Sequence, residues 1–361
     1  MTDLKGLIAA NASESLAIGG FLIGLAFGYL TQRANFCTMG SIANWITIHD
    51  ARGMRSWALA AAIAIVAVAL LSHSGVLDLK QSVYTSPRFN WAANILGGLM
   101  FGVGMVLAGG CASRNLVLAG AGDVRSGLTL LVTSLFASMT NGGVLGPVRA
   151  GLESLTAITL PMSSQRLTDM AGAMGATPGV SSLALPLLIA LALVVKCFSD
   201  KPFRTSRRHL AIGIGIGLLV AASWALTGLA YDELADRVQA PVALSFVKPS
   251  ADMFDWLERS TALGLPGFGV ASVFGTFAGG ALAAFLHRRF HLIAFANLAD
   301  TVRHMAGAAL MGIGGVLALG CSIGQGISGL STLAIGSMLS AGAIVAGTIL
   351  GVRLLQQNED K

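Results

Sequence analysis

Charged residues are scarce in this sequence of 361 residues: they make up 11% of the chain, against about 25% in an ordinary soluble domain. Apolar residues reach 54%. The apolar runs recur at the length needed to cross a bilayer core of about 30 Å. This composition excludes an ordinary soluble domain and predicts an all-α integral membrane protein.

Cysteine is scarce as well, and the four residues Cys37, Cys111, Cys197 and Cys321 stand far apart. None forms a CxxC pair or has the Cys/His spacing of a zinc site, so we expect no disulfide framework, no metal and no cofactor. A basic n-region and a convincing cleavage site are also missing at the N-terminus, so no signal peptide is predicted. The positive residues of the net charge of +6 lie in short loops, a topology signal and not a nucleic-acid signal.

Long apolar runs predict about nine transmembrane helices. Three of these runs are too long for one straight helix and contain glycine-rich breaks, which hold Cys37, Cys111 and Cys321. The 46 glycines agree with helices that pack closely or are interrupted. The predicted spans are 17–48, 57–73, 91–121, 127–145, 180–198, 210–229, 266–286, 305–337 and 338–355.

Lysine and arginine predict the orientation of these spans. The basic segment 199–209 should lie in the cytoplasm, and alternate counting places 49–56, Arg125 and the segment around Arg288 on the same side. The acidic segment 230–265 then lies outside. We therefore expect a multi-pass protein of the bacterial inner membrane, with its N-terminus outside and its C-terminus in the cytoplasm.

An internal repeat is visible in the sequence. Residues 101–111 and 311–321 share three glycines, several apolar residues and a final cysteine. A weaker match pairs 23–38 with 212–227 and places Leu226 opposite Cys37. Inverted repeats that meet near the midplane, with discontinuous helices at the site, are a common transporter design. The predicted parts are an N-terminal repeat (17–145), a linker helix (180–198) and a C-terminal repeat (210–355).

The cysteines open the second halves of the broken helices. A half-helix that starts at mid-membrane presents unpaired N–H groups and a positive dipole end, which together form an anion site. A thiol is a weak and polarizable donor, suited to a substrate with a terminal sulfur that must be released again. We therefore predict a noncovalent relay for a sulfur-containing anion past Cys37, Cys111 and Cys321. Cys197 lies outside the repeats and is expected to pack as a small hydrophobe.

Polar residues flank the three cysteines. An intramembrane charge is functional by default, although each arginine could equally extend to the interface or pair structurally. The neighbouring amides are either donors that line the path or contacts between helices. The candidate path neighbours are Arg33, Asn35, Arg114, Asn115, Ser322 and Gln325.

Three motifs, RANFC (33–37), GGCASRN (109–115) and GCSIGQG (320–326), resemble those of the YeeE/YedE family of membrane sulfur-compound transporters. The resemblance extends over roughly 17–355. It implies thiosulfate uptake into the cytoplasm past the three cysteines, no enzymatic activity, and a cytoplasmic sulfur-transferase as a partner. The segments 146–179 and 230–265, expected as extended outer loops, depart from compact members of the family.

Other functions stay open at this point. The substrate could be sulfite, a persulfide or a selenium species, since the family includes such members. A membrane thiol oxidoreductase would need a closely spaced cysteine pair, and a sulfur sensor would favour larger inside loops. Besides the sulfur anion, membrane lipid is the expected partner. A dianion that enters a negative cytoplasm is opposed by about 2.3 kcal/mol per charge per 100 mV, so coupling or rapid consumption inside is expected.

Overall fold

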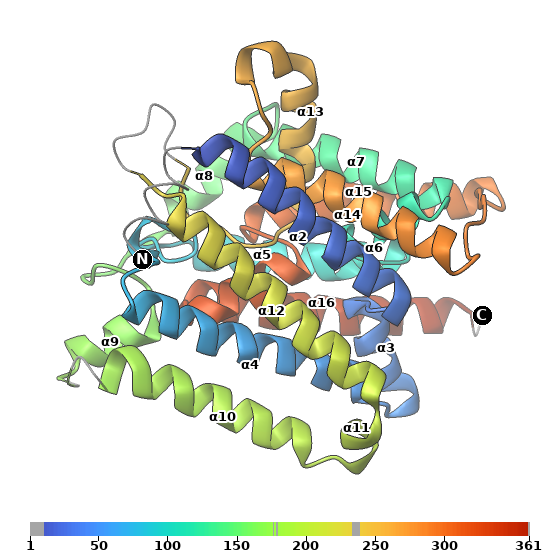
Figure 1. Cartoon of the computed structure of the whole chain (residues 1–361). Helices are drawn as coiled ribbons and strands as arrows, with labels where there is room; N and C mark the ends of the chain where they lie inside the picture. Colours follow the sequence, from blue (N-terminus) through green and yellow to red (C-terminus); the bar gives the residue numbers. More distant parts are fainter. Residues whose placement is uncertain (1–10, 176, 178–179, 233–238, 360–361) are drawn as a thin grey trace.

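The computed structural model is a bundle of helices with a single short two-stranded sheet among the residues it describes, which are 11–175, 177, 180–232 and 239–359 (Figure 1). Six of its helices are long and apolar enough to cross a membrane, or seven if the bent pair α7 and α8 forms one span. This confirms the all-α membrane fold, but not the number of nine spans. The elements are α2 (Ala12–Ala34), α3 (Thr38–Ile48), α4 (Arg52–His73), η1 (Leu79–Gln81), β1 (Arg88–Phe89), α5 (Trp91–Leu107), α6 (Ala112–Gly120), α7 (Val124–Asn141), α8 (Gly146–Thr156), β2 (Ile158–Thr159), α9 (Leu167–Ala173), η2 (Val180–Ala184), α10 (Leu185–Phe198), α11 (Lys201–Thr205), α12 (Arg207–Leu229), α13 (Val247–Leu263), α14 (Phe268–Leu286), α15 (Leu298–Leu317), η3 (Gly324–Gly329), η4 (Leu330–Thr332) and α16 (Ile335–Glu359).

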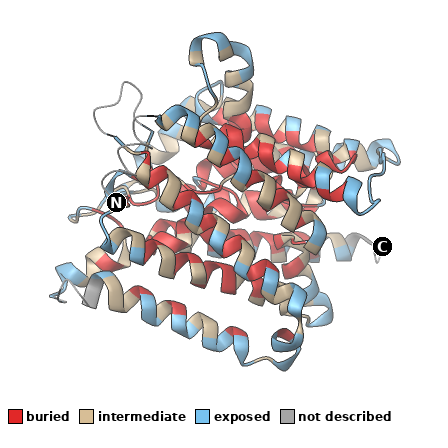
Figure 2. Ribbon diagram, in the orientation of Figure 1, coloured by how far each residue is buried: buried red, intermediate tan, exposed pale blue. Residues whose placement is uncertain are grey.

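Two of the predicted spans are not among the helices that are long and apolar enough to cross a membrane, and the reasons differ. Helix α10 has only 14 residues, preceded by the short π-helical turn η2. Helix α15 has 20 residues, but Asp300 and Arg303 lie near its start and lower its hydropathy. Both helices still lie alongside the long helices of the bundle (Figure 1). The buried residues gather at the centre of the bundle, whereas α10 exposes much of its surface (Figure 2).

The basic connections predicted to share one side do lie at one end of the bundle. Arg55 Nη1 donates to the carbonyl of Lys196 at 2.6 Å, and the amide of Val124 donates to the carbonyl of Ile293 at 2.9 Å. Figure 1 shows α11 and the C-terminus at this end, on the right, with α8 and α9 at the other. We refer to the end at α11 as the basic end. Which end faces the cytoplasm remains a prediction.

An ion pair lies at the basic end. Arg52 lies 2.7 Å from Asp50, in the turn between α3 and α4. This hydrogen-bonded arginine lowers the pKa of the Asp50 carboxyl to about 2. The carboxylate therefore stays ionised under physiological conditions and partly offsets the positive charge of this end.

The two segments expected as extended loops are structured in part. Segment 230–265 contains α13, and segment 146–179 contains α8, α9 and β2, which pairs antiparallel with β1. The expectation of loops was therefore wrong for these parts. The cause is that both segments alternate apolar and charged residues too irregularly to indicate a span, yet their helices pack against the bundle. Residues 233–238 lie outside the described part of the chain.

Glycines let the helices approach to backbone contact. A Cβ atom added to Gly24 would lie 2.3 Å from the carbonyl oxygen of Ser272, and one added to Gly28 would lie 2.1 Å from that of Thr276. No larger residue fits there without moving α2 away from α14. Small residues at such contacts are the usual means of packing helices in a membrane, where lipid removes the hydrophobic driving force.

The packing of α5 and α15 is symmetric in the register of the sequence repeat. A Cβ atom on Gly97 would lie 2.7 Å from the carbonyl oxygen of Gly314, and one on Gly104 would lie 2.7 Å from that of Gly307. The repeat pairs Gly97 with Gly307 and Gly104 with Gly314. Each of these two contacts is therefore the counterpart of the other in the repeat. Likewise α5 packs on α16 as α15 packs on α7, and α2 packs on α14 as α12 packs on α4. Two repeats related by a twofold axis would pack in this way, which supports the predicted repeats.

The weaker match holds within the helices but not at Cys37. Gly213 and Gly217, which it pairs with Gly24 and Gly28, would likewise place a Cβ atom 2.8 and 2.9 Å from the carbonyl oxygens of Ser56 and Ala60. Leu226, predicted to match Cys37, lies inside the unbroken helix α12. Helix α13 packs on α7 as α3 packs on α16, so the residue that corresponds to Cys37 is Phe246, the N-cap of α13. Phe246 is fully buried, with its ring centroid 4.9 Å from that of Phe27. The connection between the two helices is much longer in the second half, which hid the correspondence from the sequence.

Candidate functional site

The three predicted helix breaks share one backbone geometry. Two residues before each cysteine the chain is left-handed, at Asn35 (φ 52°), Gly109 (φ 73°) and Leu319 (φ 59°). In each break the next amide bonds to the carbonyl five residues back, as Gly110 does to Met105 at 2.9 Å. These bonds form a Schellman-type end, which satisfies the last carbonyls of the helix. The first helix therefore stops, and the cysteine begins the next one.

Each cysteine stands at the start of a helical segment, as predicted. Cys37 is the N-cap of α3 and Cys111 the N-cap of α6, while Cys321 precedes the segment that continues into η3. The amide of Gly40 donates to Cys37 Sγ at 3.4 Å, and that of Gly324 donates to Cys321 Sγ at 3.3 Å. The sulfurs therefore lie at the positive ends of helical turns, where an anion is favoured.

The fold brings the three cysteines together. Cys111 interacts electrostatically with both Cys37 and Cys321. The residues that follow Cys37 and Cys321 also touch, since Thr38 Oγ1 donates to Ser322 Oγ at 3.2 Å. Cys111 and Cys321 are 1% and 0% exposed, whereas Cys37 is partly exposed. The cluster is thus closed on the Cys321 side and more open on the Cys37 side.

Asn115 and Gln325 brace the breaks. Asn115 Nδ2 donates to the carbonyl of Gly110 at 2.9 Å, and Gln325 Nε2 donates to that of Ala318 at 2.6 Å. Both amides lie four residues after a cysteine and bond to a carbonyl of the break before it. Their amino groups therefore serve the backbone. The carbonyl oxygen Oε1 of Gln325, by contrast, is buried without a partner.

Arg114 lies at the Cys37 break. Its Nη2 donates to Asn35 Oδ1, and its Nη1 lies 3.5 Å from Gln32 Oε1. The arginine therefore links the start of α6 to the end of α2 and places a partly exposed positive charge near Cys37. Arg33 is exposed in the last turn of α2, where a cation favourably meets the negative end of the helix.

Cys197 lies in a separate apolar cluster. Its Sγ donates to the carbonyl of Arg55 at 3.4 Å, and its side chain is packed with Leu59 and Phe203. This environment suits the packing role expected for it. The sequence reading missed Ser113, whose hydroxyl oxygen lies 3.2 Å from Cys111 Sγ. Its position two residues after a cysteine was the only available signal.

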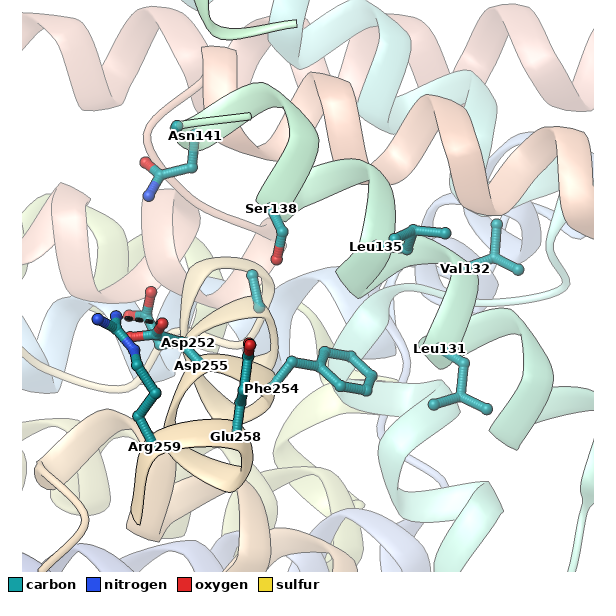
Figure 3. A pocket seen from close by; sticks show the side chains of 12 residues that line it. Leu131, Val132, Leu135, Ser138, Asn141, Asp252, Phe254, Asp255, Glu258 and Arg259 are labelled. Atoms are coloured by element: carbon teal, nitrogen blue, oxygen red, sulfur yellow. Dashed lines mark hydrogen bonds and ion pairs between the residues drawn. The ribbon is translucent and has the colours of Figure 1, made fainter. Parts of the chain in front are cut away.

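A large cleft lies elsewhere, between α7 and α13, with a volume of about 840 Å³ (Figure 3). Leu135 lines its apolar side, while Asp255 and Glu258 line the charged side, where Arg259 pairs with Asp255. None of the three clustered cysteines lines it. A narrow path through a membrane protein need not have a large volume, so the volume of this cleft does not identify it as the transport site.

Comparison with known proteins bears on the whole chain. The profile of a family described as "Sulphur transport" matches residues 33–350. The chain is 28% identical over 331 residues to "Thiosulfate transporter TsuA" of Escherichia coli (strain K12), covering 87% of each protein. It is 27% identical over 334 residues to the protein of the same name from Spirochaeta thermophila, covering 91% of this chain and 96% of the relative. A shorter match, 32% over 121 residues, is to "Probable transporter YedE" of Escherichia coli (strain K12).

Proposed function

Because this chain belongs to the sulphur transport family, we propose that it carries thiosulfate into the cytoplasm by a noncovalent relay past Cys37, Cys111 and Cys321. Its helices and its relatives make it a multi-pass membrane transporter of a sulfur anion, not an enzyme. The observation that carries the relay is the meeting of three thiols on three helix breaks of the same geometry.

The choice of thiosulfate rests on two supports. The two relatives that align with most of the chain are both named for this ion. The chemistry agrees, because a thiol offers its terminal sulfur a soft and weak contact, and weak contacts allow release. A hydroxyl in the same place would hold the oxygens of the ion, or a water molecule, more firmly.

The order along the path follows from the lengths of the helix halves. Helix α15 starts at the basic end and spans 20 residues, about 30 Å, before Cys321, which places this thiol towards the opposite end. Helix α6 continues from Cys111 to the basic end over 9 residues, about 13 Å. The ion then meets Cys321 before Cys111, and leaves beside Arg114.

This order assumes the orientation predicted from lysine and arginine, with the basic end in the cytoplasm of a bacterium and the protein in its inner membrane. Lipid would surround the apolar exposed faces of helices such as α10. A cytoplasmic sulfur-transferase that consumes thiosulfate would keep its inside concentration low and so favour uptake.

Uptake of radiolabelled thiosulfate tests the proposal directly. A strain without its own thiosulfate transporters, expressing this chain, should accumulate the label, and the same strain without the chain should not. Unlabelled thiosulfate should compete, whereas sulfite and selenite should compete poorly. No accumulation by correctly inserted protein would overturn the substrate, and strong competition by sulfite or selenite would move the proposal to those ions.

A further inference from the structure

Four buried oxygens without hydrogen-bond partners belong to residues that line one small cavity. Among the described residues, eight buried side-chain nitrogen or oxygen atoms have no partner. Four of them are Asn90 Oδ1, Asn94 Oδ1, Gln325 Oε1 and Ser337 Oγ, and all four residues line the same cavity. Asn94, Gln325 and Ser337 are only 3%, 2% and 2% exposed. Buried polar atoms normally have partners, so this concentration of unpaired oxygens indicates a ligand.

Two of these oxygens face the same point. A Cβ atom added to Gly329 would lie 2.5 Å from Ser337 Oγ and 2.7 Å from Gln325 Oε1. Gln325 is held in this orientation, because its amino group donates to the carbonyl of Ala318. Gly329 therefore packs against both unpaired oxygens too closely to carry a side chain.

The chemistry of the cavity suits a cation and not the transported anion. Three of its four unpaired atoms are amide carbonyl oxygens, which can only accept hydrogen bonds or coordinate a positive ion. Its volume of about 10 Å³ has room for about one water molecule or one small ion. An anion would be repelled by the carbonyl oxygens, and thiosulfate would not fit.

One of the two helix ends at the cavity agrees with this. Helix α15 ends at Leu317, and Leu319 in the break lines the cavity, so the negative end of a helix dipole lies beside it. The amide of Gly336, at the start of α16, already donates to Gln165 Oε1 at 3.1 Å and so is not free for an anion. Half-helix C-terminal ends and unwound carbonyls coordinate Na⁺ in other transporter folds. Arg88 also lines the cavity, but it is exposed to solvent.

We propose that this cavity binds Na⁺ and that Na⁺ binding is coupled to transport of the sulfur anion. The coupling rests on the proposed function, whereas the binding does not. Leu319 and Gln325 flank Cys321 in sequence, so a cation here would lie close to the first thiol of the relay and favour an anion there. A sodium ion that moves inward with thiosulfate would also offset part of the electrical work of bringing a dianion into a negative cytoplasm.

Thermal unfolding of the purified chain, without thiosulfate, tests the binding. At equal ionic strength Na⁺ should raise the melting temperature over K⁺ or choline, since a ligand of the native state stabilises it. Ser337→Ala removes one oxygen without adding bulk, and Gly329→Ala forces a methyl group against two of the oxygens and so displaces them. Each should raise the Na⁺ concentration for half-maximal stabilisation about tenfold or more. The matched control Gly342→Ala, with nothing within 4 Å of its new Cβ, should behave as the unmodified chain.

Uptake into vesicles separates this proposal from the proposed function. Thiosulfate uptake should rise with an inward Na⁺ gradient and fall when K⁺ replaces Na⁺. Equal melting temperatures in Na⁺ and K⁺ would overturn the site and leave water as the partner of these oxygens. Thiosulfate uptake at a rate that does not depend on Na⁺ would overturn the coupling but not the transport of thiosulfate. Stabilisation by Na⁺ without any thiosulfate uptake would overturn the proposed function and leave the Na⁺ site standing.

Discussion

The break at Cys111 and the break at Cys321 have the same backbone and different surroundings. In the repeat register Arg114 corresponds to Gly324. Arg114 reaches across to the end of α2, whereas a Cβ atom on Gly324 would lie only 2.6 Å from Ser245 Oγ, so no side chain fits there. The two matching segments therefore carry the same thiol and the same helix start, while packing leaves room for a charged side chain at only one of the two.

This difference gives the two breaks different properties. The Cys321 break is fully buried and lies beside a cavity of neutral oxygens. The Cys111 break carries a cation and adjoins the partly exposed Cys37. On the proposed path an anion would pass from a neutral, closed side to a positive, more open side, and a positive charge there would attract it towards the basic end.

The largest expected effect comes from the thiols that the two breaks share. Cys111→Ala, Cys321→Ala and Cys37→Ala should each lower thiosulfate uptake about ten- to hundredfold, because a hydrogen bond to a charged group contributes about 1.5–3 kcal/mol. Serine at the same positions should rescue poorly. The measurement is initial uptake rate, normalised to the amount of inserted protein.

Full uptake by all three alanine variants would reduce these cysteines to packing residues. A stable persulfide or S-sulfonate on any of them, found by mass spectrometry during turnover, would replace the noncovalent relay with a covalent one. Unchanged melting temperatures of the variants serve as the control for folding.

Removing the charge that distinguishes the breaks should have a smaller effect. Arg114→Gln should raise the thiosulfate concentration for half-maximal uptake about fivefold, as expected for the loss of roughly 1 kcal/mol of interaction with a partly exposed charge. Arg114→Lys keeps the charge but loses the planar fork that reaches two partners, so it should restore uptake in part. If Arg114→Gln takes up thiosulfate as the unmodified chain does, the arginine is a structural link between α6 and α2.

Replacing Asn115 or Gln325, the amides that hydrogen-bond the two breaks, should show that similar contacts hold both breaks. Asn115→Leu and Gln325→Leu each leave one buried carbonyl without its donor, which should cost about 1–3 kcal/mol of stability. Chemical unfolding in K⁺ buffer measures both losses without interference from Na⁺. Comparable losses are expected, and a loss confined to one variant would show that the breaks are held by different contacts.

The smallest effect is expected outside the two breaks. Cys197→Ala removes a weak hydrogen bond and a small buried volume, so stability should fall by about 1 kcal/mol and uptake should not change. Chemical unfolding and thiosulfate uptake check the two parts of this expectation. Loss of uptake at normal expression would contradict the assignment of the relay to the other three cysteines.

Local pattern was enough to predict much of this protein. The low charge and the apolar runs predicted an all-α membrane fold, and the structure confirms it. The glycine-rich breaks before Cys37, Cys111 and Cys321 were also visible, because a helix end and the start of the next helix depend on neighbouring residues. The match between 101–111 and 311–321 likewise survives as a symmetric contact between α5 and α15.

Long-range contacts decided the rest. The counterpart of Cys37 is Phe246 and not Leu226, because the position of α13 in the bundle depends on packing across a connection whose length differs between the halves. The amino group of Gln325 donates to the backbone, while its carbonyl oxygen faces a cavity. Which of these roles an amide takes depends on atoms that meet only after folding. Sequence by itself determined where the helices break, since backbone ends are local. Tertiary structure alone decided that the three breaks meet and that Arg114 reaches from one break to another, since burial and space are properties of the packed bundle.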